Sequence, residues 1–161
     1  MRTMDSDFSV VKSAQLEMQI QELERLISQY KGQVDYYNRQ IGSTDKSYES
    51  ITAFKKSVQE SQGSFSDINN AKSHVLEQVD AVSINNTVAT KYFVGMKRVL
   101  AGTGSKIVSK LYGFLLMKIG NEQSVLRNKS NSYLDKIEYY RKLIYKTQTE
   151  INLKKQELQS L

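Results

Sequence analysis

The sequence contains no Pro, Cys or Trp, and only eight of its 161 residues are Gly. Pro is the strongest helix breaker, because it removes a backbone donor and its ring clashes with the preceding turn, so its absence permits very long helices. Without Cys the chain has no disulfide framework and no thiolate metal site. The composition therefore allows long helices in a chain that has the length of one domain.

Long hydrophobic runs are also missing. The first residues do not combine a basic stretch with an apolar run, so we expect no signal peptide. The most apolar window, residues 107–119, is interrupted by Lys110 and Lys118 and is too short for a bilayer, which takes about 20 residues. We expect a cytoplasmic protein that is not an integral membrane protein. Any export would follow a route independent of a signal peptide.

The net charge of +6 is unevenly distributed. Residues 1–90 hold 9 basic and 12 acidic side chains, whereas residues 91–161 hold 14 basic and 5 acidic ones. A basic half can bind an acidic partner or nucleic acid. It can equally be a solvated helix face that is attracted to the acidic half of the same chain. We favour the second interpretation, because the basic residues are scattered rather than clustered.

Apolar residues in the N-terminal part recur in steps of four and three without a miss, which is the heptad period of a coiled coil. We call this row of interior heptad positions the seam. Polar residues occupy the rest of each turn, so such a helix needs a partner to bury its seam. The N-terminal seam consists of Leu16, Ile20, Leu23, Ile27, Tyr30, Val34, Tyr37 and Ile41.

A matching seam lies in the C-terminal part. It consists of Tyr133, Ile137, Tyr140, Ile144, Thr147, Ile151, Lys154, Leu158 and Leu161. An antiparallel arrangement that pairs Leu16 with Leu158 and Leu23 with Ile151 places each Tyr opposite an aliphatic residue. Shifts by one or two heptads remain open. The fold class is therefore all-α, a long antiparallel helical hairpin or coiled coil that a partner chain could complete into a bundle.

The pairing places the hairpin turn at 86–95, between an N-terminal arm (1–85) and a C-terminal arm (96–161) of a single domain, 1–161. Ser, Thr and Asn are dense around 83–90, as in many turns. We expect a break near 42–45, where Thr44 or Asp45 could cap a new helix, and another near 102–105. Between 48 and 82 the apolar residues keep helical spacing. They include Tyr48, Ile51, Phe54, Val58, Phe65, Ile68 and Val75.

No motif supports catalysis or cofactor binding. His74 is the only histidine, and with no Cys it lacks the companions of a metal site. The glycines and lysine of 102–106 superficially resemble a phosphate-binding loop but lack the preceding strand and the full spacing. We expect no enzymatic activity, no metal and no cofactor.

The window 107–119 is apolar on more than one helix face. Leu111, Phe114 and Leu115 follow one stripe, and Ile119 broadens it. One facing helix cannot cover so wide a surface. We therefore take Leu111, Phe114, Leu115 and Ile119 as candidate residues for binding a protein partner. The alternative is that they form the internal core of a four-helix region.

Phe93 and Gly95 form an aromatic-x-Gly motif at the expected turn. This layout resembles the Trp-x-Gly helical-hairpin superfamily of type VII secretion, and within it the YwqH-like proteins encoded beside LXG toxins in Gram-positive bacteria. Two departures stand out. Phe93 replaces the Trp, and no Tyr is followed four residues later by Asp or Glu, so a partner would have to supply that export signal.

The resemblance implies a helical adaptor or targeting chaperone that binds the N-terminal helical domain of an LXG toxin. A second small helical protein could join the complex, and export together with the toxin is an open alternative. No small-molecule substrate is implied. Two other functions stay open. One is a structural coiled-coil subunit, with a homodimer as its simplest form, and the other is a basic binder of nucleic acid or membrane surfaces.

Overall fold

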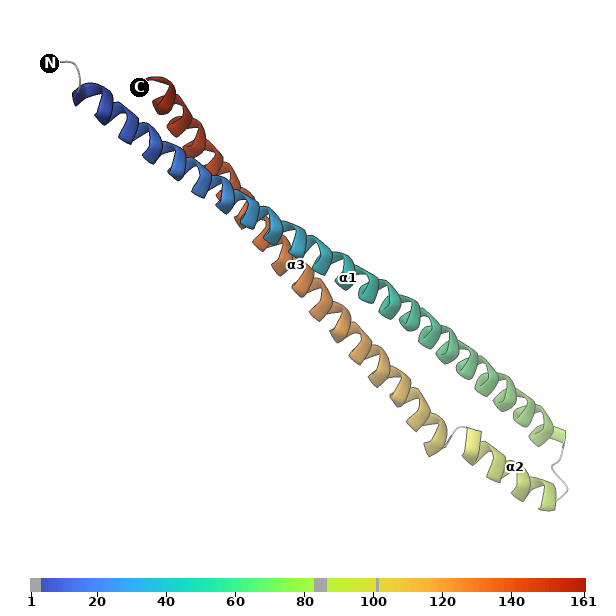
Figure 1. Ribbon diagram of the computed structural model, residues 1–161. Coiled ribbons are helices and arrows are strands. Elements are labelled where there is room, and N and C mark those ends of the chain that lie inside the picture. Colours follow the sequence, from blue (N-terminus) through green and yellow to red (C-terminus); the bar gives the residue numbers. More distant parts are fainter. Residues whose placement is uncertain (1–3, 83–86, 101) are drawn as a thin grey trace. The chain divides into compact units, whose positions relative to one another are not determined.

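A computed structural model describes residues 4–82, 87–100 and 102–161. They form three helices, α1 (Met4–Val82), α2 (Thr87–Leu100) and α3 (Thr103–Gln159), and no strand occurs among these residues. The chain is an all-α helical hairpin built from these three helices (Figure 1). The absence of Pro allows α1 to continue for 79 residues.

The hairpin divides into two compact units. Unit 1 combines Met1–Lys46 with Arg127–Leu161, and unit 2 is Ser47–Leu126. Unit 1 therefore contains the first part of α1 and the last part of α3. Unit 2 contains the rest of α1, all of α2 and the first part of α3.

In unit 1 the predicted seam residues form the interface between the two helices. Ile151 is the most buried side chain, with 1% of its surface exposed. Ile20 and Ile27 complete the buried cluster, and partly buried apolar residues pack against it. All of the predicted positions from Leu16 to Ile41 and from Tyr133 to Leu158 are buried or half-buried, and only Leu161 is exposed. The heptad pattern thus identifies the core of this unit correctly.

Polar contacts at the border of the seam establish the direction and register of unit 1. Lys12 pairs with Glu157 at 3.0 Å, and the Lys154 ammonium donates to Gln19 Oε1 at 2.8 Å. Lys155 pairs with Glu24 at 3.0 Å. Low numbers on α1 meet high numbers on α3, so the helices are antiparallel. Of the registers that the sequence leaves open, these contacts fit the unshifted one.

The tyrosines of the seam contact one another, which the sequence did not predict. Tyr30 and Tyr140 have ring centroids 5.9 Å apart, and Tyr37 lies 5.7 Å from Tyr133 and 6.1 Å from Tyr140. The Lys136 ammonium lies 5.2 Å from the centroid of the Tyr37 ring. We expected each Tyr to face only an aliphatic residue. Offset and tilted ring pairs are favourable in their own right, so the rings cluster across the seam.

The break expected near 42–45 is wrong, because α1 continues through these residues. Thr44 is buried, with 7% exposure, and its hydroxyl donates to the Gln40 carbonyl at 2.8 Å. That bond to the residue four positions earlier is the one a Thr makes inside a helix. Thr44 therefore does not cap a new helix. Its side chain extends the seam of unit 1.

The turn expected at 86–95 is also wrong for the residues that the structure describes there. Helix α2 begins at Thr87, so Phe93 and Gly95 lie within a helix, whereas residue 86 lies outside the described residues. A single Gly costs a helix only about 1 kcal/mol relative to Ala and does not end it. Tyr92, Met96 and Val99 recur at helical spacing around Gly95.

A break does lie close to 102–105. Helix α2 ends at Leu100 and α3 begins at Thr103, with Gly102 between them. A Cβ atom at Gly102 would come within 1.6 Å of the Arg98 carbonyl oxygen, so only Gly fits this position. Ser105 lies inside α3, two residues after its start. Its hydroxyl oxygen accepts a hydrogen bond from the Asn69 side-chain amide.

Candidate interaction surface

The seam of unit 2 alternates apolar and polar side chains. Buried or half-buried residues recur at heptad spacing on both helices, but amides, hydroxyls and a lysine stand among them. Val58, Leu76 and Ile119 are the apolar residues described as buried in this unit. The inward residues are Tyr48, Ile51, Lys55, Val58, Gln62, Phe65, Asn69, Ser73 and Leu76 on α1, with Ser105, Val108, Tyr112, Leu116, Ile119, Gln123 and Leu126 on α3.

Side-chain hydrogen bonds join the two helices of unit 2. The Lys55 ammonium donates to Gln123 Oε1 at 3.2 Å, and Gln123 Nε2 donates to Thr52 Oγ1 at 2.9 Å. Farther along, Phe65 and Tyr112 have ring centroids 6.2 Å apart. Polar seam residues specify register at a cost in stability. The inner side of unit 2 therefore fixes the pairing, and polar groups occupy part of it.

Large apolar side chains of unit 2 lie outside its seam. Phe54, Ile68 and Val75 of α1 are 52–55% exposed. The exposed residues of α3 form a row at helical spacing. We call the combined surface the outer apolar face, and it comprises Phe54, Ile68, Val75, Ile107, Leu111, Phe114, Leu115 and Val125.

The two rows border the same side of the seam. Phe54, Ile68 and Val75 each immediately precede an inward residue of α1, and Leu115 immediately precedes the inward residue Leu116 of α3. In an antiparallel pair, positions that precede the seam in this way face each other across one side of the hairpin. Leu111 lies four residues before Leu115 and shares its side of α3. Apolar side chains of both helices thus lie on the same side of the hairpin.

The four residues predicted to contact a partner divide into two sets. Leu111, Phe114 and Leu115 are 60%, 54% and 38% exposed and belong to the outer apolar face. Ile119 is only 7% exposed and lies in the seam of unit 2, so its assignment to a partner surface is wrong. Its helical spacing from Tyr112 and Leu116 explains the difference. The window 107–119 is broadly apolar because it supplies both an inner and an outer face.

The sequence analysis missed the α1 side of this face. It grouped Phe54, Ile68 and Val75 with Val58 and Phe65 in one stripe, although the first three are exposed and the other two point inward. The spacing of the three exposed residues in the sequence would have distinguished them from the inward ones. Phe54, Ile68 and Val75 are separated by 14 and 7 residues. They therefore repeat at one heptad position that differs from the position of Val58 and Phe65.

Gly95 has no structural requirement for Gly in this arrangement. An added Cβ atom would meet no atom within 4 Å, and no described Gly has a positive φ. The geometry of α2 therefore does not supply the tight turn that the resemblance implies for Phe93 and Gly95. Two large residues of α2, Tyr92 and Val99, have 66% and 73% of their surface exposed.

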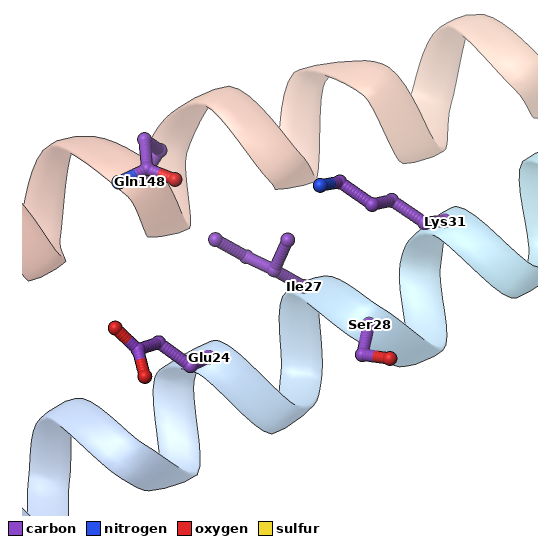
Figure 2. A pocket seen from close by; sticks show the side chains of 5 residues that line it. All are labelled: Glu24, Ile27, Ser28, Lys31 and Gln148. Carbon is purple, nitrogen blue, oxygen red and sulfur yellow. The ribbon is translucent and has the colours of Figure 1, made fainter.

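The described residues include a shallow pocket, a histidine and a carboxyl with a shifted pKa. Figure 2 shows a shallow pocket of unit 1, where Ile27 of α1 points toward the part of α3 that carries Gln148. His74 is exposed and lies 3.2 Å from the Gln78 amide nitrogen. The hydrogen bond and charge of Lys142 lower the pKa of Glu138 on the surface.

The described residues contain no group of three His, Asp or Glu side chains that could hold a metal ion. Among these same residues, no helix is long and apolar enough to cross a membrane.

No protein-family model, curated protein or solved structure matches this chain.

Proposed function

We propose that this chain is a non-enzymatic helical adaptor whose outer apolar face binds a helical domain of another protein. One observation carries the proposal, namely that unit 2 holds polar residues in its seam while large apolar residues remain outside it. Soluble proteins rarely expose contiguous apolar surfaces unless these bind something. A partner helix on this face would complete a small bundle around unit 2.

The energetic reason is the apolar area that a partner would remove from water. Burying one Leu or Phe side chain is worth roughly 1.5–3 kcal/mol. Leu111, Phe114 and Leu115 of α3 and Phe54 of α1 are each more than a third exposed. Together they offer enough apolar surface to stabilise a complex after the entropy cost of association is met.

The specific partner that we propose is the N-terminal helical domain of an LXG toxin exported by type VII secretion. The support is the resemblance in layout, a helical hairpin that needs a partner to complete it. Phe93 and Gly95 do not add to this support, because they lie within α2. The adaptor would pair with the toxin domain and present a composite bundle to the secretion machinery, with the export signal supplied by a partner.

Co-expression with the helical domain of a toxin encoded next to this gene tests the proposal. Changing Leu111 and Leu115 together to Glu places two charges where a dry contact is expected, which costs several kcal/mol when the contact forms. We expect the double variant to lose the complex in size-exclusion chromatography. Because both side chains are exposed, its helicity by circular dichroism should equal that of the wild type.

A matched control changes Leu134 and Leu153 to Glu. These residues are 52% and 61% exposed but lie in unit 1, so this variant should still form the complex. Capture of the toxin domain by the Leu111 and Leu115 variant would disprove the proposed surface. Loss of helicity in that variant alone would assign these residues to the protein's own core and end their role as a partner site.

A further inference from the structure

The segment that contains α2 and the first turns of α3 has charges of one sign only. Residues 81–121 include six Lys and Arg and no Asp or Glu, although 17 of the 161 residues of the chain are acidic. The matching part of α1 differs, because residues 47–82 hold five acidic and three basic side chains. The α3 side of the outer apolar face is therefore basic from Ile107 to Lys118, and Glu122 is the acidic residue that separates this basic part from Val125.

Lysines of α3 lie directly beside the exposed apolar residues. Lys110 follows Ile107 by three residues and precedes Phe114 by four, so these residues share one side of the helix. Lys118 follows Phe114 by four, and its ammonium lies 5.4 Å from the centroid of the Phe114 ring. This contact holds a positive charge at the edge of the apolar surface.

These lysines differ from those of unit 1. Lys12 and Lys155 each reach a glutamate of the opposite helix at 3.0 Å. Lys106, Lys110 and Lys118 form no ion pair with any residue that the structure describes, and the Lys118 ammonium lies over the Phe114 ring. In unit 1 Lys12 and Lys155 are thus paired with glutamates across the hairpin. Along the outer apolar face it leaves the cations of α3 for another molecule.

We propose that the segment covering the outer apolar face is an amphipathic helix with an acidic edge, oriented so that its Asp and Glu residues lie beside Lys110 and Lys118. This inference rests on the proposed function and adds the charge of the partner. Residues that flank an interhelical seam contact each other across it, so opposite charges there favour the correct partner and orientation.

An anionic membrane surface fits this face less well. A flat bilayer would contact the α1 border as well as the α3 border, and α1 carries Glu60 and Asp67 next to the exposed row that contains Ile68. Those carboxylates would repel anionic lipids. A helix has two different edges, so it can place its acidic edge along α3 alone.

Two designed peptides of about four heptads test the charge requirement on the full-length protein. Both carry Leu at the seam positions, and the flanking positions are Glu in one peptide and Lys in the other. By fluorescence anisotropy at low salt, we expect the Glu peptide to bind and the Lys peptide to bind at least about tenfold more weakly. Added salt should weaken the binding of the Glu peptide.

Charge reversal in the protein should reverse the preference. The variant with Lys110→Glu and Lys118→Glu should bind the Lys peptide better than the Glu peptide. A variant with Lys129→Glu and Lys146→Glu has the same net charge but changes positions outside the outer apolar face, so it should keep the preference of the wild type. If both variants preferred the same peptide, net charge alone would explain the preference, and the proposal would be overturned.

Other outcomes separate this inference from the proposed function. If the protein bound both peptides equally, or bound neither, the proposal that the partner helix has an acidic edge would be overturned. The proposed function would still be decided separately, by the test of the toxin domain with the Leu111 and Leu115 variant. Binding to vesicles of phosphatidylglycerol that is lost on reversal of Lys110 and Lys118 would replace the helix by a lipid surface. A dimer in sedimentation equilibrium that the Leu111 and Leu115 variant abolishes would identify a second copy as the occupant.

Discussion

Units 1 and 2 each pair a part of α1 with a part of α3, yet they differ in how their apolar residues are divided between the seam and the outside. In unit 1 apolar side chains dominate a seam that also holds Thr44, Thr147 and Lys154, and two lysines pair with glutamates along its border. In unit 2 a lysine and several amides enter the seam, and Phe54, Leu111 and Phe114 stay outside. Unit 1 therefore buries more apolar residues between its two helices, whereas unit 2 leaves a row of them outside, where we propose that a partner helix binds.

The difference shows that two segments can share the heptad spacing and still differ in which residue types they bury. Both units repeat at the coiled-coil period, but stability depends on which residue types occupy the inner positions. Apolar seams supply most of the free energy of folding, and polar seams restrict the register. A coiled coil can therefore combine a part that holds the hairpin together with a part that remains ready to bind.

The largest loss of stability should follow a change of the most buried residue of unit 1. Changing Ile151 to Ala removes a side chain that is 1% exposed and should cost about 2–5 kcal/mol of unfolding free energy. The same change at Ile119 of unit 2, which is 7% exposed, should cost less, because that side chain shares its seam with polar groups. Urea unfolding monitored by far-ultraviolet circular dichroism measures both. Equal losses would show that the two seams do not differ in strength.

The second effect should be a gain in stability. Replacing Lys55 and Gln123 together by Leu exchanges a polar contact of the unit 2 seam for an apolar one and should stabilise the protein by about 1–2 kcal/mol. Changing Lys56, whose side chain is 79% exposed, to Leu is the control and should leave stability nearly unchanged. Thermal unfolding of the two variants provides the comparison. A loss of stability in the double variant would mean that the polar contact is needed for folding rather than for register.

A smaller effect tests whether the seam of unit 1 continues through Thr44. Changing Thr44 to Val replaces a buried hydroxyl by a methyl group and leaves the Gln40 carbonyl within its helix. We expect a change of less than about 1 kcal/mol, in the stabilising direction. Thr149, which makes the same bond to Tyr145 at an exposed site, is the control for the change from Thr to Val. A loss of about 1 kcal/mol at Thr44 alone would indicate a helix cap.

The smallest effect concerns a surface pair of unit 1. Lys142, 2.7 Å from Glu138, lowers the pKa of that carboxyl below its usual value. A lowered pKa stabilises the fold above the usual pKa, and the contribution disappears as the pH falls through the lowered value. Because the group is exposed, the effect on unfolding should be barely detectable, although an NMR titration of Glu138 should show the shift. In the Lys142→Met variant the pKa of Glu138 should return toward its usual value.

How far the sequence predicts this fold depends on the regularity of the pattern. Between Leu16 and Ile41 no heptad position is missed, and every predicted residue lies in the seam. From Tyr48 onward the seam includes Lys55, Gln62 and Asn69, which a search for apolar residues passes over. Local composition was also misleading at the ends of helices. Thr44 has the chemistry of a helix cap, but its burial and its hydrogen bond to the Gln40 carbonyl place it inside α1.

The candidate surface was half predictable for a related reason. Periodicity shows that 107–119 has two apolar faces, and it cannot show which one the hairpin covers. That depends on the register, which places Ile119 in the seam and leaves Leu111 and Leu115 outside. The pairing of the two seams predicts where the middle of the turn lies in the sequence. It could not show that Phe93 and Gly95 lie within a helix, because α2 follows α1 and precedes α3 along the chain.

The tyrosine cluster of unit 1 gives the molecule a built-in optical probe. With no Trp in the chain, Tyr dominates its near-ultraviolet absorption and emission, and seven of the ten tyrosines lie in unit 1. Tyr36 and Tyr37 have centroids 5.1 Å apart and Tyr139 and Tyr140 5.4 Å, so neighbouring rings couple electronically. The near-ultraviolet dichroism of this protein should therefore report mainly the packing of unit 1. Far-ultraviolet signals follow both units, so the two measurements together can distinguish the opening of one unit from the unfolding of the whole hairpin.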